Sequence, residues 1–156
     1  MRDVYITFTA TRYFDESSYY LKRVVREAVK ATLDYEDFPY DAEVSVTFCD
    51  NEYIRGLNKE FRNVDRHTDV LSFPMYENGE FDKVECQGGA VLGDIVISIE
   101  RAKEQAKEIG NTFHHEIAFL TVHSVLHLLG YDHERSPEDE EEQCQRQRAI
   151  IENVDI

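Results

Sequence analysis

Three histidines in the C-terminal part of the chain have the spacing of a metal site. His123 and His127 are four residues apart, and His133 follows six residues later. Four residues of an α-helix turn through about 400°, so the first two imidazoles point the same way, one turn apart. Gly130 can adopt the left-handed conformation that ends a helix and turns the chain back. The pattern therefore predicts that the three imidazoles converge on one metal ion.

The predicted ligand set indicates catalytic rather than structural zinc. Three neutral imidazoles with one open position are typical of catalytic zinc, whereas structural zinc sites close with four ligands and favour cysteine. A zinc ion in that setting lowers the pKa of its water to about 7, which makes hydroxide available at neutral pH. We expect one Zn²⁺ per chain; three imidazoles also suit nickel, copper or iron.

The histidines match the metzincin frame H-x-x-x-H-x-x-G-x-x-H, which is found in zinc peptidases. In those peptidases the residue after the first histidine is a glutamate, the general base for the attacking water. Here that residue is Ser124, which cannot take the proton. Either the substrate is not a peptide or another group handles the proton. Asp132 is a candidate base, and equally a residue that orients a ligand or caps the turn.

Four basic residues upstream follow one another at intervals of four, three and four: Arg55, Lys59, Arg62 and Arg66. They share one face of a helix if the helix continues that far. The guanidinium of Arg62 could hold a phosphate through two parallel hydrogen bonds, which would suit a phosphodiester substrate. The alternative is a solvated helix face whose cations pair locally with Glu60 and Asp65.

The pattern of apolar residues and caps predicts the elements that must position these side chains. Four strands are expected, over residues 4–8, 42–49, 69–73 and 94–97. Five helices are expected, from the caps at 15–18 to about 33, from 51 to about 61, over 99–110, over 112–130, and from 137 onward. Residues 76–89 are expected to form a hairpin excursion or a mobile loop. The fold class predicted is α+β, one domain over residues 1–156, with a small mixed four-stranded sheet and a zincin-like metal helix.

The composition and the net charge indicate the cellular compartment and restrict how the protein could bind nucleic acid. The 156 residues are 42% hydrophobic and 31% charged, which excludes disordered and collagen-like chains. Cys49, Cys86 and Cys144 stand singly and no apolar run has the length of a membrane span, so we expect a reducing compartment, the cytoplasm. The net charge of −15 repels nucleic acid at long range, so a nucleic-acid substrate requires local basic residues.

Four segments together resemble a known family: Leu57–Arg62, Thr68–Pro74, Leu92–Ile97 and His123–His133. They are similar to the YbeY endoribonucleases, which are zinc-dependent ribosomal RNA maturation factors. The last segment is the most specific, because the family pattern has the same three histidines, the same Gly-Tyr-Asp-His ending and no glutamate. The chain departs from the pattern at Ser124, where the family usually has glycine, and at His67, where proline is usual.

The resemblance implies an α+β fold, His123, His127 and His133 as zinc ligands, and Arg62 as a residue of the active cleft. It implies single-strand-selective cleavage of RNA in maturation of small-subunit ribosomal RNA and in ribosome quality control, with small ribosomal subunit proteins as candidate partners. Two alternatives stay open at this point. One is a metal-dependent peptidase or amide hydrolase, and the other is a non-catalytic ribosome-assembly factor that binds metal for folding.

Overall fold

The computed structural model describes residues 2–16, 18–76, 80–81, 89–132 and 134–154. Its strands are β1 (Val4–Ala10), β2 (Ala42–Cys49), β3 (Val70–Pro74) and β4 (Ala90–Ser98). Its helices are α1 (Tyr19–Tyr35), α2 (Asn51–Arg62), α3 (Ile99–Ile109), α4 (Phe113–Leu128) and α5 (Pro137–Ile151). The strand order is β1-β2-β4-β3, with β3 antiparallel to β4 and the other neighbours parallel. The predicted α+β class, with a mixed four-stranded sheet and five helices in the described part of the chain, is confirmed.

Each helix begins at a polar side chain that accepts a hydrogen bond from a backbone N–H of the first turn. The five caps are Ser18, Asp50, Ser98, Thr112 and Ser136. Such a cap satisfies one of the four N–H groups that have no partner inside the helix. The acidic residues after Ser136 lie in the first turn of α5, where the helix dipole favours negative charge.

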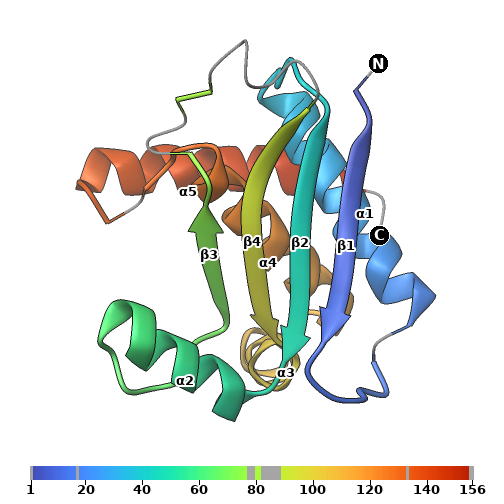
Figure 1. Cartoon of the computed structure of the whole chain (residues 1–156), viewed down its shortest axis with the longest axis vertical. Helices are drawn as coiled ribbons and strands as arrows, with labels where there is room; N and C mark the ends of the chain where they lie inside the picture. The colour runs from blue at the N-terminus through green and yellow to red at the C-terminus, as the bar shows by residue number, and fades with distance from the viewer. Residues whose placement is uncertain (1, 17, 77–79, 82–88, 133, 155–156) are drawn as a thin grey trace.

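The sheet has two unlike faces. Helices α1, α4 and α5 cover one face (Figure 1), and the main core of the molecule lies between them and the strands. Inward side chains of β2, such as Val44 and Val46, are fully buried there. On the opposite face α2 forms a smaller core near the β3 edge, where Ile54 packs with Leu71 and Val96. The edge strand β3 therefore has α4 on one side and α2 on the other.

Gly93 allows β3 to approach β4 closely. Its φ is +141°, in the region that favours glycine, and a Cβ added there would lie 2.1 Å from the carbonyl oxygen of Phe73. The same Cβ would lie 3.1 Å from a methyl carbon of Leu128 on α4. A side chain at this position would push β3 away from both β4 and α4.

Three further expectations concern cysteines, membranes and the segment 76–89. Cys49 and Cys144 are free thiols, while Cys86 lies outside the described residues. In the described ranges, no helix combines the length and the apolar character needed to cross a bilayer. The segment 76–89 connects the antiparallel strands β3 and β4, but residues 77–79 and 82–88 lie outside the described part of the chain.

Candidate active site

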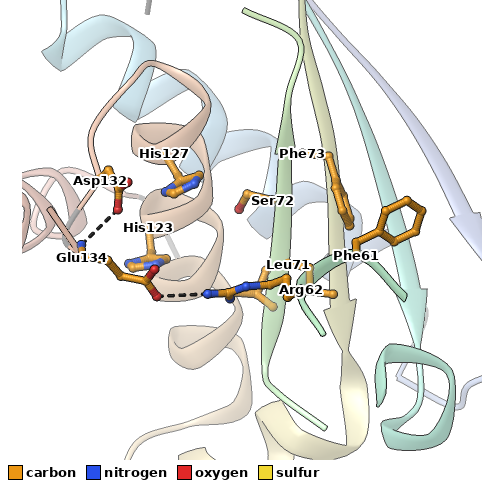
Figure 2. Close-up of a pocket in the computed structure, with 10 residues that line it drawn as sticks. Phe61, Arg62, Leu71, Ser72, Phe73, His123, His127, Asp132 and Glu134 are labelled. Carbon is orange, nitrogen blue, oxygen red and sulfur yellow. Dashed lines mark hydrogen bonds and ion pairs between the residues drawn. The ribbon is translucent and has the colours of Figure 1, made fainter. Parts of the chain in front are cut away.

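A cleft of about 410 Å³ lies where α4, the edge strand β3 and the end of α2 meet. The residues that line it come from segments far apart in the chain: Phe61, Arg62, Val70, Leu71, Ser72, Phe73, His123, His127, Asp132 and Glu134. Figure 2 shows the two histidines on α4 facing the cleft and Arg62 entering it from the direction of β3. The structure thus brings two of the three predicted metal ligands and the predicted phosphate-binding arginine to one place.

The end of α4 has the turn that the sequence predicts. Gly130 has φ +109°, and its N–H donates to the carbonyl oxygen of His127 at 3.0 Å. The N–H of Tyr131 donates to the carbonyl oxygen of Leu126 at 3.1 Å. This pair of bonds is a Schellman motif, which ends a helix and reverses the chain. The chain that follows the histidine helix therefore returns toward the cleft, where Asp132 and Glu134 line it.

The third predicted ligand, His133, lies outside the described residues. Among the described residues, no group of three or more histidine, cysteine, aspartate or glutamate side chains could hold a metal ion. His123 and His127 nevertheless fit zinc in donor type, since imidazole nitrogen is a preferred zinc ligand. They also share one cleft. Zinc binding by these two residues together with His133 stays a prediction.

The imidazole of His123 is held from behind by α5. Its Nδ1 lies 3.0 Å from the side-chain oxygen of Gln147. The side-chain nitrogen of Gln143, which can only donate, lies 3.3 Å from the same Nδ1. The contact with Gln147 is the shorter of the two, and an amide oxygen can only accept, so it favours the proton on Nδ1 and the ring lone pair on Nε2. With the proton on Nδ1, the side-chain nitrogen of the fully buried Gln143 donates instead to the backbone carbonyl oxygen of His123 at 3.5 Å. Metal-binding histidines in general donate their second N–H to such a partner, which fixes the ring and its tautomer.

Arg62 lies in the cleft, but the four basic residues do not all share one helix face as the sequence predicts. Helix α2 ends at Arg62 because Asn63 adopts the left-handed conformation, so Arg66 lies beyond the helix. Arg55 pairs with Asp65 at 2.8 Å, as the alternative interpretation expected. Arg62 instead pairs across the cleft with Glu134 at 3.0 Å. Both partners are about half exposed, so this ion pair is weak enough for an anion to displace the carboxylate.

Three further polar residues, Asp132, Ser72 and Asp94, lie differently with respect to the cleft. Asp132 lines the cleft, and its carboxylate also accepts a hydrogen bond from the backbone N–H of Glu134 at 3.0 Å. It therefore combines a capping role with a position from which it could take a proton. Ser72 points from β3 toward the histidines (Figure 2). Asp94, on β4 opposite Phe73, is not among the described residues that line the cleft.

Ser124, at the position of the peptidase glutamate, faces the protein interior. Its side chain is fully buried, and the hydroxyl oxygen has no hydrogen-bond partner among the described residues. It is not among the residues that line the cleft. The substitution of glutamate by serine therefore removes the peptidase base and leaves a small side chain packed in the core.

Three site residues were missed by sequence reasoning: Gln143, Gln147 and Glu134. The two glutamines stand four residues apart in a helix rich in charged residues, and with Ile150 they form its buried face. Uncharged residues at helical spacing in this charged segment indicate the buried face of α5. Nothing in the sequence around Glu134 indicates that it reaches Arg62, which is 72 residues away in the chain.

Comparison with known proteins identifies the family. The family model described as Endoribonuclease YbeY matches residues 8–155. The chain belongs to the endoribonuclease YbeY family. It is 46% identical over 142 residues to the endoribonuclease YbeY of Acetivibrio thermocellus, a match that covers 85% of this chain and 86% of that one. It is 48% identical over 149 residues to that of Clostridium acetobutylicum, covering 87% and 89% of the two chains.

A solved structure shares the fold. The solution structure of TM1509 from Thermotoga maritima aligns with a TM-score of 0.61 and 30% sequence identity, covering 96% of this chain and 88% of that one. Membership in the YbeY family confirms two predictions made from the sequence, the family resemblance and a hydrolase of the endoribonuclease class. The metal, the catalytic residues and the biological RNA stay predictions.

Proposed function

We propose that this protein is a zinc-dependent endoribonuclease that cuts single-stranded RNA, and that it acts in the cytoplasm in maturation of small-subunit ribosomal RNA and in ribosome quality control. One observation carries the proposal. Two predicted zinc ligands, His123 and His127, share a single cleft with Arg62, a residue suited to a phosphate group. Family membership supports RNA as the substrate class.

The zinc ion would be held by His123, His127 and His133. Bound there, it would supply a Lewis acid that polarises a phosphoryl oxygen and lowers the pKa of water. The protein contributes the orientation of the ligands. The contact between Gln147 and the Nδ1 of His123 favours one tautomer and one direction of this ring.

Arg62 would bind the scissile phosphate and stabilise the negative charge that develops on it. In the structure its guanidinium already contacts a carboxylate oxygen of Glu134, so the geometry suits an oxyanion. A phosphate would replace Glu134 at this position. The released carboxylate and that of Asp132 are then the acidic groups in the cleft that can take or return a proton.

The net charge of −15 explains why a partner is expected at the ribosome. Most of the surface repels RNA, so affinity for free RNA should be low. Contact with small ribosomal subunit proteins would bring the cleft to its RNA without a large basic surface. We therefore expect ribosomal RNA as the substrate and small-subunit proteins as partners.

The two alternatives, a peptidase and a non-catalytic assembly factor, each predict a result that differs from that of the nuclease. A peptidase needs a base where this chain has the buried Ser124, and it has no use for Arg62 in the cleft. A non-catalytic assembly factor would bind small subunits and zinc, and it would cut nothing.

The test compares one RNA sequence in single-stranded form and in a complete duplex, with the zinc-loaded wild-type protein and the variant His123→Ala. The expected result is cleavage of the single strand at least about tenfold faster than the duplex, with none by the variant. Cosedimentation with small ribosomal subunits is measured in parallel. Equal cleavage of both forms contradicts single-strand selectivity, and cosedimentation without cleavage favours the assembly factor.

A further inference from the structure

The aromatic ring of Phe61 is exposed at the edge of the candidate active site. The apolar side of α2 begins with the fully buried Ile54 and continues through the partly buried Leu57 to Phe61. Phe61 is 60% exposed, although its ring contacts Phe73 of the edge strand. Exposure alone does not distinguish Phe61, since Tyr13 and Tyr19 are more exposed. Phe61 differs because it lines the cleft that holds Arg62 and the two histidines.

The ring is supported in a fixed orientation. Phe73, on the edge strand β3, packs against it edge to face, with ring centroids 5.4 Å apart and an angle of 71° between the planes. Phe73 itself is held in the sheet opposite Asp94 of β4. A ring fixed in this way loses little conformational freedom when a flat ligand stacks on it.

Phe61 and its neighbour Arg62 point in different directions from the end of α2. Figure 2 shows Arg62 reaching toward the histidines, with Phe61 and Phe73 on the opposite side of β3. Both Phe61 and Arg62 line the cleft. The cation that shares the cleft with the ring is Arg62, the next residue in the chain. An exposed ring in one cleft with a guanidinium is a combination that suits single-stranded nucleic acid.

We propose that Phe61, supported by Phe73, is a stacking subsite for an unpaired base of the RNA, the base of a nucleotide next to the phosphate at Arg62. The inference rests on the proposed function and adds a source of its strand selectivity. A nucleotide has the two chemical parts that this site separates, an anion for the guanidinium and a flat ring for the phenyl group. A base inside a duplex is already stacked on both faces and cannot reach the subsite.

The chain contains no tryptophan, so one introduced at position 61 is a specific reporter. The variant Phe61→Trp is mixed in a stopped-flow instrument with a short single-stranded RNA, and its fluorescence is read before cleavage proceeds. A second oligonucleotide of the same length lacks its bases but keeps its phosphates. The matched control is Tyr19→Trp, at an exposed position at the start of α1. Both oligonucleotides are also prepared with a fluorescent label, and their binding to the protein is measured separately by fluorescence anisotropy.

The expected result is that the RNA quenches the fluorescence of the Phe61→Trp variant and the abasic oligonucleotide does not, with no quenching of the control variant. In cleavage assays, Phe61→Leu lowers kcat/KM for single-stranded RNA by about 5- to 150-fold, and Phe61→Tyr stays within about twofold of wild type. Equal quenching by the abasic oligonucleotide, or unchanged cleavage by Phe61→Leu, would overturn the stacking subsite. If the wild-type protein still cuts RNA in that case, the proposed function is unaffected. If the wild-type protein neither binds nor cuts RNA, the proposed function fails and the subsite fails with it.

Discussion

The Nδ1 atom of His123 lies 3.0 Å from the side-chain oxygen of Gln147, which reaches it from α5. Gln147 is only 4% exposed, so water does not compete for this contact. Helix α5, which carries no predicted metal ligand, thereby becomes part of the site, because it sets the tautomer of a histidine on α4.

Replacing Gln147 tests this role. Gln147→Leu keeps the size of the side chain roughly constant but removes the acceptor, so the imidazole loses its fixed tautomer and orientation. We expect the affinity for zinc to fall by about 10- to 100-fold. Competition with a chromophoric chelator measures this directly. The control is Gln145→Leu, at an exposed position of the same helix. An unchanged affinity in a folded Gln147→Leu protein would contradict the positioning role.

The ion pair between Arg62 and Glu134 leads to two opposite predictions for RNA. Arg62→Ala removes the group that stabilises charge on the phosphate, and kcat/KM should fall by about 10²- to 10³-fold. Glu134→Gln removes a competitor for the guanidinium, and RNA affinity should rise by up to about fivefold, the limit for an exposed pair. Single-turnover cleavage and RNA binding at fixed salt measure the two effects.

Arg55 provides the matched control for Arg62. It lies on the same helix and forms an ion pair with Asp65, but it does not line the cleft. Arg55→Ala should change RNA cleavage by less than about threefold at constant salt. If Arg55→Ala and Arg62→Ala reduce cleavage equally, the arginines act only through general charge, and the specific role of Arg62 is wrong.

Gly93 is predicted to be essential for the position of β3. Gly93→Ala should lower the free energy of unfolding by about 3 kcal/mol or more, because it combines a positive φ with a clash against the backbone of Phe73. Gly56→Ala is the control, since Gly56 is in α2 and a Cβ there meets nothing within 4 Å. That change should stabilise the protein by about 0.5–1 kcal/mol. Urea unfolding distinguishes them, and equal stability of the two variants would contradict the packing described.

A buried carboxyl group predicts a dependence of stability on pH. Glu116 is 3% exposed, and burial, with a smaller effect of the nearby Asp69, raises its pKa above the ordinary 4.5. The folded protein therefore keeps a proton that the unfolded chain loses. The stabilising contribution of this group is complete below about pH 4.5 and is lost as the pH rises through the raised pKa.

Glu116→Gln should consequently match wild type in stability at pH 4 and exceed it at pH 8. Thermal or urea unfolding over this pH range provides the measurement. Asp69→Asn removes the smaller cause only, so it should reduce the pH dependence without abolishing it. A Glu116→Gln protein that is less stable than wild type at pH 8 would show that the carboxylate is stabilising, against this prediction.

Elements with local signals were predictable from the sequence. The caps Ser98 and Thr112 and the terminating Gly130 act through neighbouring backbone groups, so the residues themselves indicate where α3 and α4 begin and where α4 ends. The start of β4 was predicted late, at residue 94 instead of Ala90. A glycine inside a strand weakens the local strand signal, and here Gly93 lies at a close approach between β3 and β4.

The contacts that complete the site depend on packing and not on local sequence. Arg62 and Glu134 are 72 residues apart in the chain, and they meet only because β3 is the edge strand beside α4. The contact of Gln147 with His123 likewise requires α5 to pack on α4. Histidine spacing could reveal candidate ligands, since helix geometry fixes it, but the groups that orient them come from distant segments.

The most direct test of the central claim uses metal-quantified wild-type protein and the variant His127→Ala, shown by circular dichroism to keep its fold. Each is incubated with a single-stranded RNA and with an unfolded protein, before and after chelation and after zinc is restored. We predict that the zinc-loaded wild type cuts only RNA, that chelation or His127→Ala abolishes this, and that zinc restores it to the chelated wild type. Cleavage of the protein alone, or of neither substrate with one zinc bound per chain, would contradict the account.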